Sequence, residues 1–600
     1  MSHPMPPSAP NSVRDTTSPA LQLPLVAIRH RGVSKPNRVP ETLVEGSIQQ
    51  PDAVSSPLTI LDYQRDVLER SILFFDTLRR RANIMLEREQ DGLPPVLNFK
   101  YETLLDARTF GRPANYALLR ILEVGEDCWD DCVDPTKAPV IVIDPRAGHG
   151  PGIGGFKRES EVGEALHAGH PVYFVSFFPE PCPHQTLADV LDALKQFVAH
   201  VAKLHDGKRP ILYGNCQGGW VAALLAAHCS GSTGPAVLVG APLSYWEGAP
   251  AVNPMRLAGG FVGGVWLTHF LADINQDHFD GAWLAQNFES LKPGNAVWDK
   301  YADLFTKMDT EADRFLDFER WWNGFSQMSG EEMVSIVEDL FVGNKLEQGK
   351  LRVDEHCIVD LTTIKKPLVI FASYGDNITP PHQALGWIPT IYKTTDALKI
   401  AGQRIVYLTN PHSGHLGIFV SAKVARFEHR AILENLEDIE KLAPGLYEMK
   451  IENPTGNPEC ERHQYTVRFE PRVVEDLRFD YPRDAFDRVR QVSELNEKIY
   501  RTFFSPWVKL WSNPWTAQTM QWMHPMRMRT YMWSEHFMPH MSAYGVLANA
   551  VAKNRHRLPD DHPSMTQERR LVAQISGYWE SFAKLRDASQ ERVFTTLYGK

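Results

Sequence analysis

The stretch RPILYGNCQGGWVAALLAAH, residues 209–228, constrains the fold of this 600-residue chain more than any other segment. An apolar run typical of a buried strand enters the turn GNCQGG, and a helical pattern follows at once. A residue at the top of such a turn is strained, so small neighbours are needed, and Gly214, Gly218 and Gly219 supply them. Cys216 then takes the position of a nucleophile, and the helix N-terminus behind it favours the thiolate. The alternative is a buried structural cysteine in a glycine-rich turn.

Short apolar runs alternate with helical patterns over the middle of the chain. The predicted strands cover residues 138–144, 171–177, 209–214, 235–240, 367–373 and 404–410. Helices are expected between them, over residues 186–204 and 219–228 among others. Continuous apolar runs of this length indicate strands that are buried on both faces. The predicted fold class is therefore α/β, a mostly parallel sheet with helices on both faces.

Two later strands end next to residues that could complete a catalytic triad with the cysteine. Asp376 follows the run 367–373, and His415 follows the run 404–410. Nucleophile, acid and histidine in this chain order are typical of the α/β-hydrolase fold. We expect His415 to withdraw the thiol proton, and Asp376 to orient the imidazole or act as a second base. His412 is a competing candidate, but Gly414 beside His415 favours the latter.

A glycine-rich loop follows the first predicted strand and has two interpretations. In a hydrolase it supplies the second backbone N–H that binds an oxyanion, here near Ala147, Gly148 and His149, beside the N–H of Gln217. The same loop contains the pattern G-x-G-x-x-G at residues 150–155, which also occurs in dinucleotide-binding proteins. We favour the oxyanion interpretation, because a hydrolase needs glycine here in any case, and we expect no cofactor.

The remaining segments divide the chain into regions. Residues 1–57 are expected to be a disordered or wrapping arm, and residues 58–135 a helical region. A catalytic domain is expected over 136–430, with a large helical cap inserted at about 245–364. Residues 431–600 are expected to form a C-terminal extension, a hairpin followed by helices rich in Trp and Met.

Composition limits the function classes. The formal charge, 63 − 73 = −10, argues against a protein that mainly holds nucleic acid. Seven cysteines form an odd, sparse set that indicates a reducing compartment. Cys128 and Cys132 are more typical of ordinary thiols than of a metal site, so no metal is expected. We see no secretory signal, and the apolar stretch 261–272 is too short to span a bilayer. A cytoplasmic protein without a transmembrane segment is expected.

Two further features concern which residues are buried and which are exposed. Residues 505–541 carry five Trp and seven Met, which by default belong in the interior. A surface for a protein partner or a hydrophobic granule is the alternative. His429 and the basic residues near it are expected on a solvated helix face.

At this point the residues resemble a known family, the polyhydroxyalkanoate synthases, over about half the chain. The turn GNCQGG, the segments GDNITP (375–380) and SGHL (413–416), and the cap motif FERWWN (318–323) are similar to motifs of that family. The resemblance implies an α/β-hydrolase fold and transfer of hydroxyacyl groups from CoA thioesters through Cys216. It also implies a homodimer working at a granule surface.

Several departures leave alternatives open. The glycine-rich loop 144–155 is unlike the Pro-rich loop expected in the synthases. The region 431–600 has no recognisable counterpart in them. A thioesterase or a hydrolase resembling the dienelactone hydrolases is the second hypothesis, although an insertion of this size is unlike their small cap. A non-catalytic scaffold of the same fold is the third. Trp321 and Trp322 are expected in the core of the cap, or alternatively along an acyl passage.

Overall fold

The computed structural model describes residues 57–123, 133–229, 231–354, 357–452, 465–477, 479 and 483–599. The expected N-terminal arm, except for its last residue, lies outside the described residues, as do Cys128 and Cys132. The residues from Pro57 onward form one compact unit.

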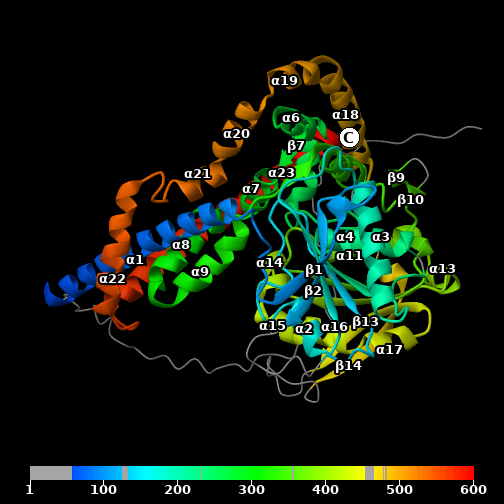
Figure 1. Ribbon diagram of the computed structural model, residues 1–600, viewed down its shortest axis with the longest axis horizontal. Coiled ribbons are helices and arrows are strands. Elements are labelled where there is room, and N and C mark those ends of the chain that lie inside the picture. The colour runs from blue at the N-terminus through cyan, green and yellow to red at the C-terminus, as the bar shows by residue number, and fades with distance from the viewer. Residues whose placement is uncertain are drawn as a thin grey trace, which may run out of the picture. The chain divides into compact units, whose positions relative to one another are not determined.

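A ten-stranded sheet organises this unit, with the strand order β1-β2-β4-β3-β5-β6-β11-β12-β13-β14 (Figure 1). The strands are β1 (Lys100–Asp106), β2 (Tyr116–Glu123), β3 (Val140–Ile143), β4 (Val172–Phe177), β5 (Ile211–Asn215), β6 (Ala236–Val239), β11 (Leu368–Ser373), β12 (Arg404–Asn410), β13 (Gly445–Glu452) and β14 (Thr466–Arg472). Neighbours from β4 to β13 are parallel, whereas β1, β2 and β14 pair antiparallel. This order, with a sharp turn after β5, is that of the α/β-hydrolase fold, as predicted.

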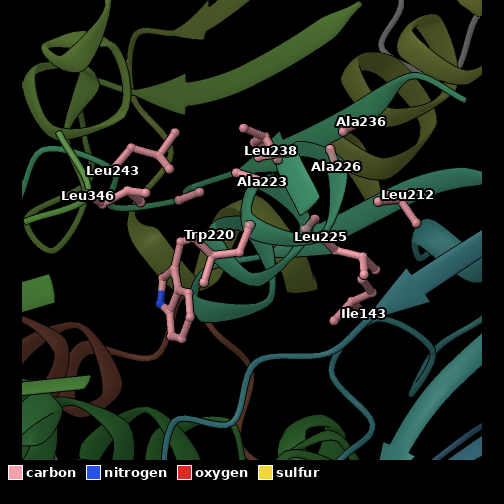
Figure 2. Close-up of a cluster of buried hydrophobic side chains, with 14 of the residues drawn as sticks. Ile143, Leu212, Trp220, Ala223, Leu225, Ala226, Ala236, Leu238, Leu243 and Leu346 are labelled. Carbon is pink, nitrogen blue, oxygen red and sulfur yellow. The ribbon is translucent and has the colours of Figure 1, made fainter. Parts of the chain in front are cut away.

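Alternate residues of each central strand face opposite sides of the sheet. Ile141 and Ile143 of β3 belong to the hydrophobic cluster beneath α3 (Leu187–Leu204) and α4 (Gln217–His228), part of which Figure 2 shows around Trp220. Val140 and Val142 belong to the opposite cluster, which α2 (Glu161–His167) and α16 (Arg430–Glu434) cover. Burial of each aliphatic side chain stabilises the fold by about 2 kcal/mol. A slip by one residue would move every side chain to the other face of the sheet, so the two packed faces fix the register of these strands.

The cap lies between β6 and β11 in the chain. Its elements are α5 (Ala258–Val262), α6 (Trp266–Ile274), β7 (His278–Asp280), α7 (Ala282–Leu291), α8 (Lys300–Thr306), α9 (Met308–Trp322), β8 (Gln327–Ser329), α10 (Gly330–Ser335), β9 (Arg352–Asp354) and β10 (Cys357–Ile358). The strands β7 and β8 form a small antiparallel sheet of their own, and so do β9 and β10. Short helices α11 (Pro381–Leu385), α12 (Trp387–Ile391) and α13 (Thr395–Ile400) then connect β11 to β12, and α14 (His415–Val420), α15 (Ala422–Val424), α16 and α17 (Leu436–Lys441) connect β12 to β13.

The region 58–135 is only partly helical, which corrects the sequence expectation. The helix α1 (Pro57–Gln90) is present, but residues 100–123 form β1 and β2, which extend the main sheet. The first four residues of β1 are exposed at the sheet edge. An edge strand therefore tolerates the polar sequence KYETLLD, which has no apolar run that could reveal it.

The C-terminal extension begins inside the sheet, because β13 pairs with β12 and β14 completes the edge. The helices that follow are α18 (Arg483–Ile499), α19 (Ser505–Trp511), α20 (Pro514–Trp522), α21 (Pro525–Tyr531), α22 (Ser542–Lys553) and α23 (Pro563–Tyr598). Helix α1 packs against α22 and α21 of the C-terminal extension and against α9 of the cap (Figure 1). Buried ion pairs fix this packing: Arg70 with Glu568 at 2.6 Å, and Arg81 with Glu319 at 3.1 Å.

The Trp- and Met-rich segment is largely exposed, contrary to the default expectation of an interior position. No residue of α19 is buried, and Trp511 has 79% of its surface exposed. Trp507, Leu510 and Trp515 are exposed as well. A surface of this kind is typical of an interaction site, and the identity of a partner stays a prediction.

Among the described helices, none by itself is long and apolar enough to cross a bilayer. The consecutive helices at 254–262 and 266–274 reach the required length together, but they are bent by 76°.

Candidate active site

The predicted nucleophile turn is present between β5 and α4. Cys216 has φ 49° and ψ −113°, a left-handed conformation that costs an L-residue free energy. A Cβ added to Gly214 would lie 2.3 Å from the carbonyl oxygen of Gly218, and one on Gly218 would lie 2.1 Å from that of Ile143. At Gly219 an added Cβ would lie 2.5 Å from Cβ of Ala241. All three positions therefore require glycine. The strained turn places Cys216 at the carboxyl ends of the parallel strands.

The predicted acid and histidine lie together at the same sheet edge. Nδ1 of His415 is 2.7 Å from Oδ2 of Asp376, and both side chains are buried. The other carboxylate oxygen of Asp376 accepts the backbone N–H groups of Ile378 and Thr379, at 2.7 and 2.9 Å. The carboxylate is thus held by three hydrogen bonds, and it fixes the ring with Nε2 free for another partner. His412, the competing candidate, is exposed.

The imidazole and the cysteine line the same cavity and interact electrostatically. Burial by itself lowers the pKa of His415, but the charges of Asp376 and of the Cys216 thiolate, with hydrogen bonds to both, raise it to about 10. The raised pKa allows the His415 ring to hold a proton at neutral pH, including one taken from the Cys216 thiol. A thiolate is the nucleophilic form of cysteine.

A cavity of about 450 Å³ lies over Cys216 and His415. Its walls are mainly aromatic and aliphatic, and the aromatic residues are Phe288, Phe318, Trp321, Trp322 and Phe419. Only 6% of the surface of Cys216 is exposed, so the thiol meets this cavity rather than open solvent. A pocket with apolar walls and a few polar groups at one end is typical of a site for a small organic ligand.

Trp321 and Trp322 are buried in the cap, as expected, and both also border the cavity, whereas the passage of an acyl chain along them stays a prediction. The indole N–H of Trp321 donates to the carbonyl oxygen of Gly150 at 3.0 Å. Nδ1 of His149 lies 2.8 Å from the carbonyl oxygen of Trp322, and the two rings are 4.3 Å apart. The cap tryptophans therefore brace the glycine-rich loop against the cavity.

The predicted oxyanion loop lies beside the cysteine. Ala147 and His149 line the cavity, and Gly148 packs so closely on the cap that an added Cβ would be 2.3 Å from the carbonyl oxygen of Gly281. Within the described part of the chain, the backbone N–H groups of Ala147 and Gln217 donate to no protein acceptor. These two donors are available for a negatively charged oxygen next to the thiol.

The structure does not support dinucleotide binding by the loop at residues 150–155. The backbone N–H groups of Gly152, Ile153 and Gly154 donate to the buried carboxylate of Asp144, at 2.5, 3.0 and 2.9 Å. The next helix, α2, begins only at Glu161. Groups that a phosphate would need are therefore already engaged within the loop. Burial raises the pKa of Asp144 to about 7, against the lowering effect of these hydrogen bonds.

The cap segment 288–300 also borders the cavity, through Lys292, Asn295 and Lys300 among others. Sequence reasoning missed it, because an ordinary helical pattern gives no sign of which face meets a cavity elsewhere in the chain. Among the described residues, no three His, Cys, Asp or Glu side chains cluster in a way that could hold a metal ion.

Strand order, nucleophile turn and His–Asp pair together define an enzyme of the α/β-hydrolase class. The chain belongs to the DUF3141 family, described as "Protein of unknown function (DUF3141)", whose model matches residues 66–600. An uncharacterized protein of Rhizobium meliloti, from the ackA 5' region, is 41% identical over 549 residues, which cover 90% of this chain and 74% of that protein.

A more distant relative agrees with the resemblance found in the motifs. The "Poly(3-hydroxyalkanoate) polymerase subunit PhaC" of Haloarcula marismortui is 23% identical over 44% of this chain and 54% of its own length. The chain is thus a divergent relative of these polymerase subunits and matches about half of one. The solved structure of Paleococcus ferrophilus monoacylglycerol lipase is 14% identical, with a TM-score of 0.29 over 50% of this chain and 96% of the lipase. The strand order and the turn, rather than this likeness, define the fold.

Proposed function

We propose that this protein is a cysteine-dependent acyltransferase that takes 3-hydroxyacyl groups from CoA thioesters. The observation that carries the proposal is the convergence of Cys216 with the His415–Asp376 pair at one end of an apolar cavity. A thiol nucleophile suits transfer better than most alternatives, because exchange of one thioester for another is nearly balanced in free energy. The distant relationship to polymerase subunits supports a hydroxyacyl substrate.

In the first step the Cys216 thiolate attacks the carbonyl carbon of the thioester. The oxyanion that forms accepts hydrogen bonds from the backbone N–H groups of Gln217 and Ala147. The carbon–sulfur bond to CoA then breaks, and the CoA thiolate takes the proton from Nε2 of the His415 imidazolium. The product is an acyl group bound to Cys216, with neutral His415 hydrogen-bonded to Asp376 through Nδ1–H.

In the second step a hydroxyl group attacks the acyl-cysteine. His415 accepts the hydroxyl proton at Nε2, an ester bond forms, and Cys216 leaves as the thiolate beside the restored imidazolium. A hydroxyl at the end of an earlier acyl group would extend a polyester. Water as the acceptor would release a free acid instead, which is the thioesterase reaction.

The test is incubation of the full chain with 3-hydroxybutyryl-CoA, with CoA release and product mass followed together. Release of CoA with an oligomeric ester supports the proposal. Release with only free 3-hydroxybutyrate identifies a thioesterase, and absence of release identifies a scaffold. Cys216→Ala must abolish the release, because any activity that survives it does not use this thiol.

A further inference from the structure

The last long helix, α23, lies across the cap segment that borders the Cys216 cavity. The hydroxyl of Ser576 donates to Oδ1 of Asp299 at 2.5 Å, and the guanidinium of Arg586 donates to the carbonyl oxygen of Leu291 at 3.2 Å. Gly294 lets the helix approach closely, because an added Cβ would lie 2.7 Å from Cβ of Trp579. These contacts fix the helix at the mouth of the active site.

A second cavity, of about 1130 Å³, lies outside the first and shares part of its wall. The shared residues include Leu291, Lys292, Asn295, Phe318 and Leu416. The outer wall of this second cavity comes from α23, through Val572, Ser576, Gly577, Trp579, Glu580 and Ala583. A molecule that passes through the outer cavity to the thiol therefore moves between the cap and α23.

We propose that α23 forms the outer wall of a substrate passage to Cys216 and sets the size of the acyl substrate that reaches the thiol. The proposal rests on the proposed function, since it takes Cys216 as the reacting group. It gives α23, a helix of the C-terminal extension to which the sequence assigns no role, a part in substrate selection.

The charges around the passage favour selection by size rather than by charge. Lys584 pairs with Glu580 at 2.6 Å, and Lys300 pairs with Glu319 at 2.9 Å. Arg314 pairs with Glu311. Lys292, which borders both cavities, lies in no ion pair among the described residues, but the wall of the outer cavity also carries Asp299, Asp303 and Asp587. The wall therefore has little net attraction for an anionic ligand, and its shape becomes the main determinant.

Gly577 provides a direct way to narrow the passage. It lies in α23 and borders the outer cavity, and an added Cβ would meet no atom within 4 Å. A large side chain at this position has room to project without disturbing the fold. The adjacent Tyr578 has 76% of its surface exposed and is absent from the cavity wall, which makes it a matched control.

The experiment measures modification of Cys216 in the full chain by a small reagent, iodoacetamide, and by a bulky one, N-(1-pyrenyl)maleimide. The readout is the mass of the peptide that contains Cys216, so it does not depend on acyl transfer. In Gly577→Trp the rate at which the bulky reagent modifies Cys216 should fall by about tenfold relative to the rate with iodoacetamide, as expected for a modest steric cost. In Tyr578→Trp this ratio should stay as in the unmodified chain, and in Trp579→Ala the bulky reagent should react faster.

If the ratio of the two modification rates is the same in Gly577→Trp and Tyr578→Trp, the proposed passage along α23 is wrong, while the proposed function is unaffected. A Cys216 that reacts with neither reagent, while Cys182 and Cys229 do react, would overturn both. An unchanged iodoacetamide rate in Gly577→Trp shows that the variant is folded and that only access has changed.

Discussion

Nδ1 of His415 lies 2.7 Å from Oδ2 of Asp376, although 39 residues separate them in the chain. The strands β11 and β12 run parallel and adjacent, so their carboxyl ends bring the two side chains to one sheet edge. The remaining oxygen of the carboxylate is held by two backbone N–H groups. The carboxylate of Asp376 is thus held in place by the backbone and in turn orients the ring of His415, so substitutions of the two residues test separate roles.

Asp376→Asn should reduce acyl transfer by roughly a thousandfold or more, because the amide no longer holds the imidazole in the required tautomer. The pKa of His415 should also fall from about 10 toward the ordinary value of 6.5, since the carboxylate raises it. An NMR titration of the His415 ring measures this shift. Asp313→Asn, at a surface carboxylate, is the control and should change neither quantity.

The raised pKa of His415 also predicts a loss of stability at high pH. Below pH 6.5 the ring is protonated in both the folded and the unfolded chain, so its full contribution is present. That contribution disappears as the pH rises from 6.5 to about 10, where the folded ring loses its proton. The difference in free energy of unfolding between the unmodified chain and His415→Gln should therefore shrink over this range. A constant difference in urea denaturation from pH 6 to pH 10 would contradict the ion pair.

His429 predicts the opposite behaviour in acid. Its ring is buried, with Nδ1 2.5 Å from the hydroxyl of Tyr213 and Nε2 2.8 Å from the carbonyl oxygen of Ile418. Burial lowers the pKa of His429 to about 4, so stability is present above pH 6.5 and is lost as the pH falls toward 4. In His429→Gln the slope of stability against pH should be flatter in this range. His412→Gln, at an exposed ring, should keep the original slope.

Gly218→Ala should destabilise the fold by about 3 kcal/mol, because the new methyl group would meet backbone that cannot move away. Gly577→Ala is the matched control, with open space around the added Cβ. In that helix alanine should stabilise by about 0.5–1 kcal/mol. Denaturant unfolding of both variants measures the contrast, and similar values would show that the turn is not tightly packed.

The central sheet, the turn at Cys216 and the approach of Asp376 to His415 could be predicted from the sequence, because buried parallel strands have continuous apolar runs and the turn GNCQGG has a strict spacing. The edge strand β1 could not, since its exposed positions accept charged residues and remove the apolar signal. The burial of His429, expected on a solvated face, follows from packing that its helical neighbours do not reveal. The approach of α23 to the cap likewise depends on contacts between distant segments, such as Ser576 with Asp299.

The most direct test of the central claim is the mass of the enzyme after rapid mixing with 3-hydroxybutyryl-CoA and an acid quench. The account predicts a mass increase of one hydroxybutyryl group, located on the peptide with Cys216 and absent in Cys216→Ala. An acyl group found on another residue, or CoA release with no acyl group ever bound to Cys216, would contradict it.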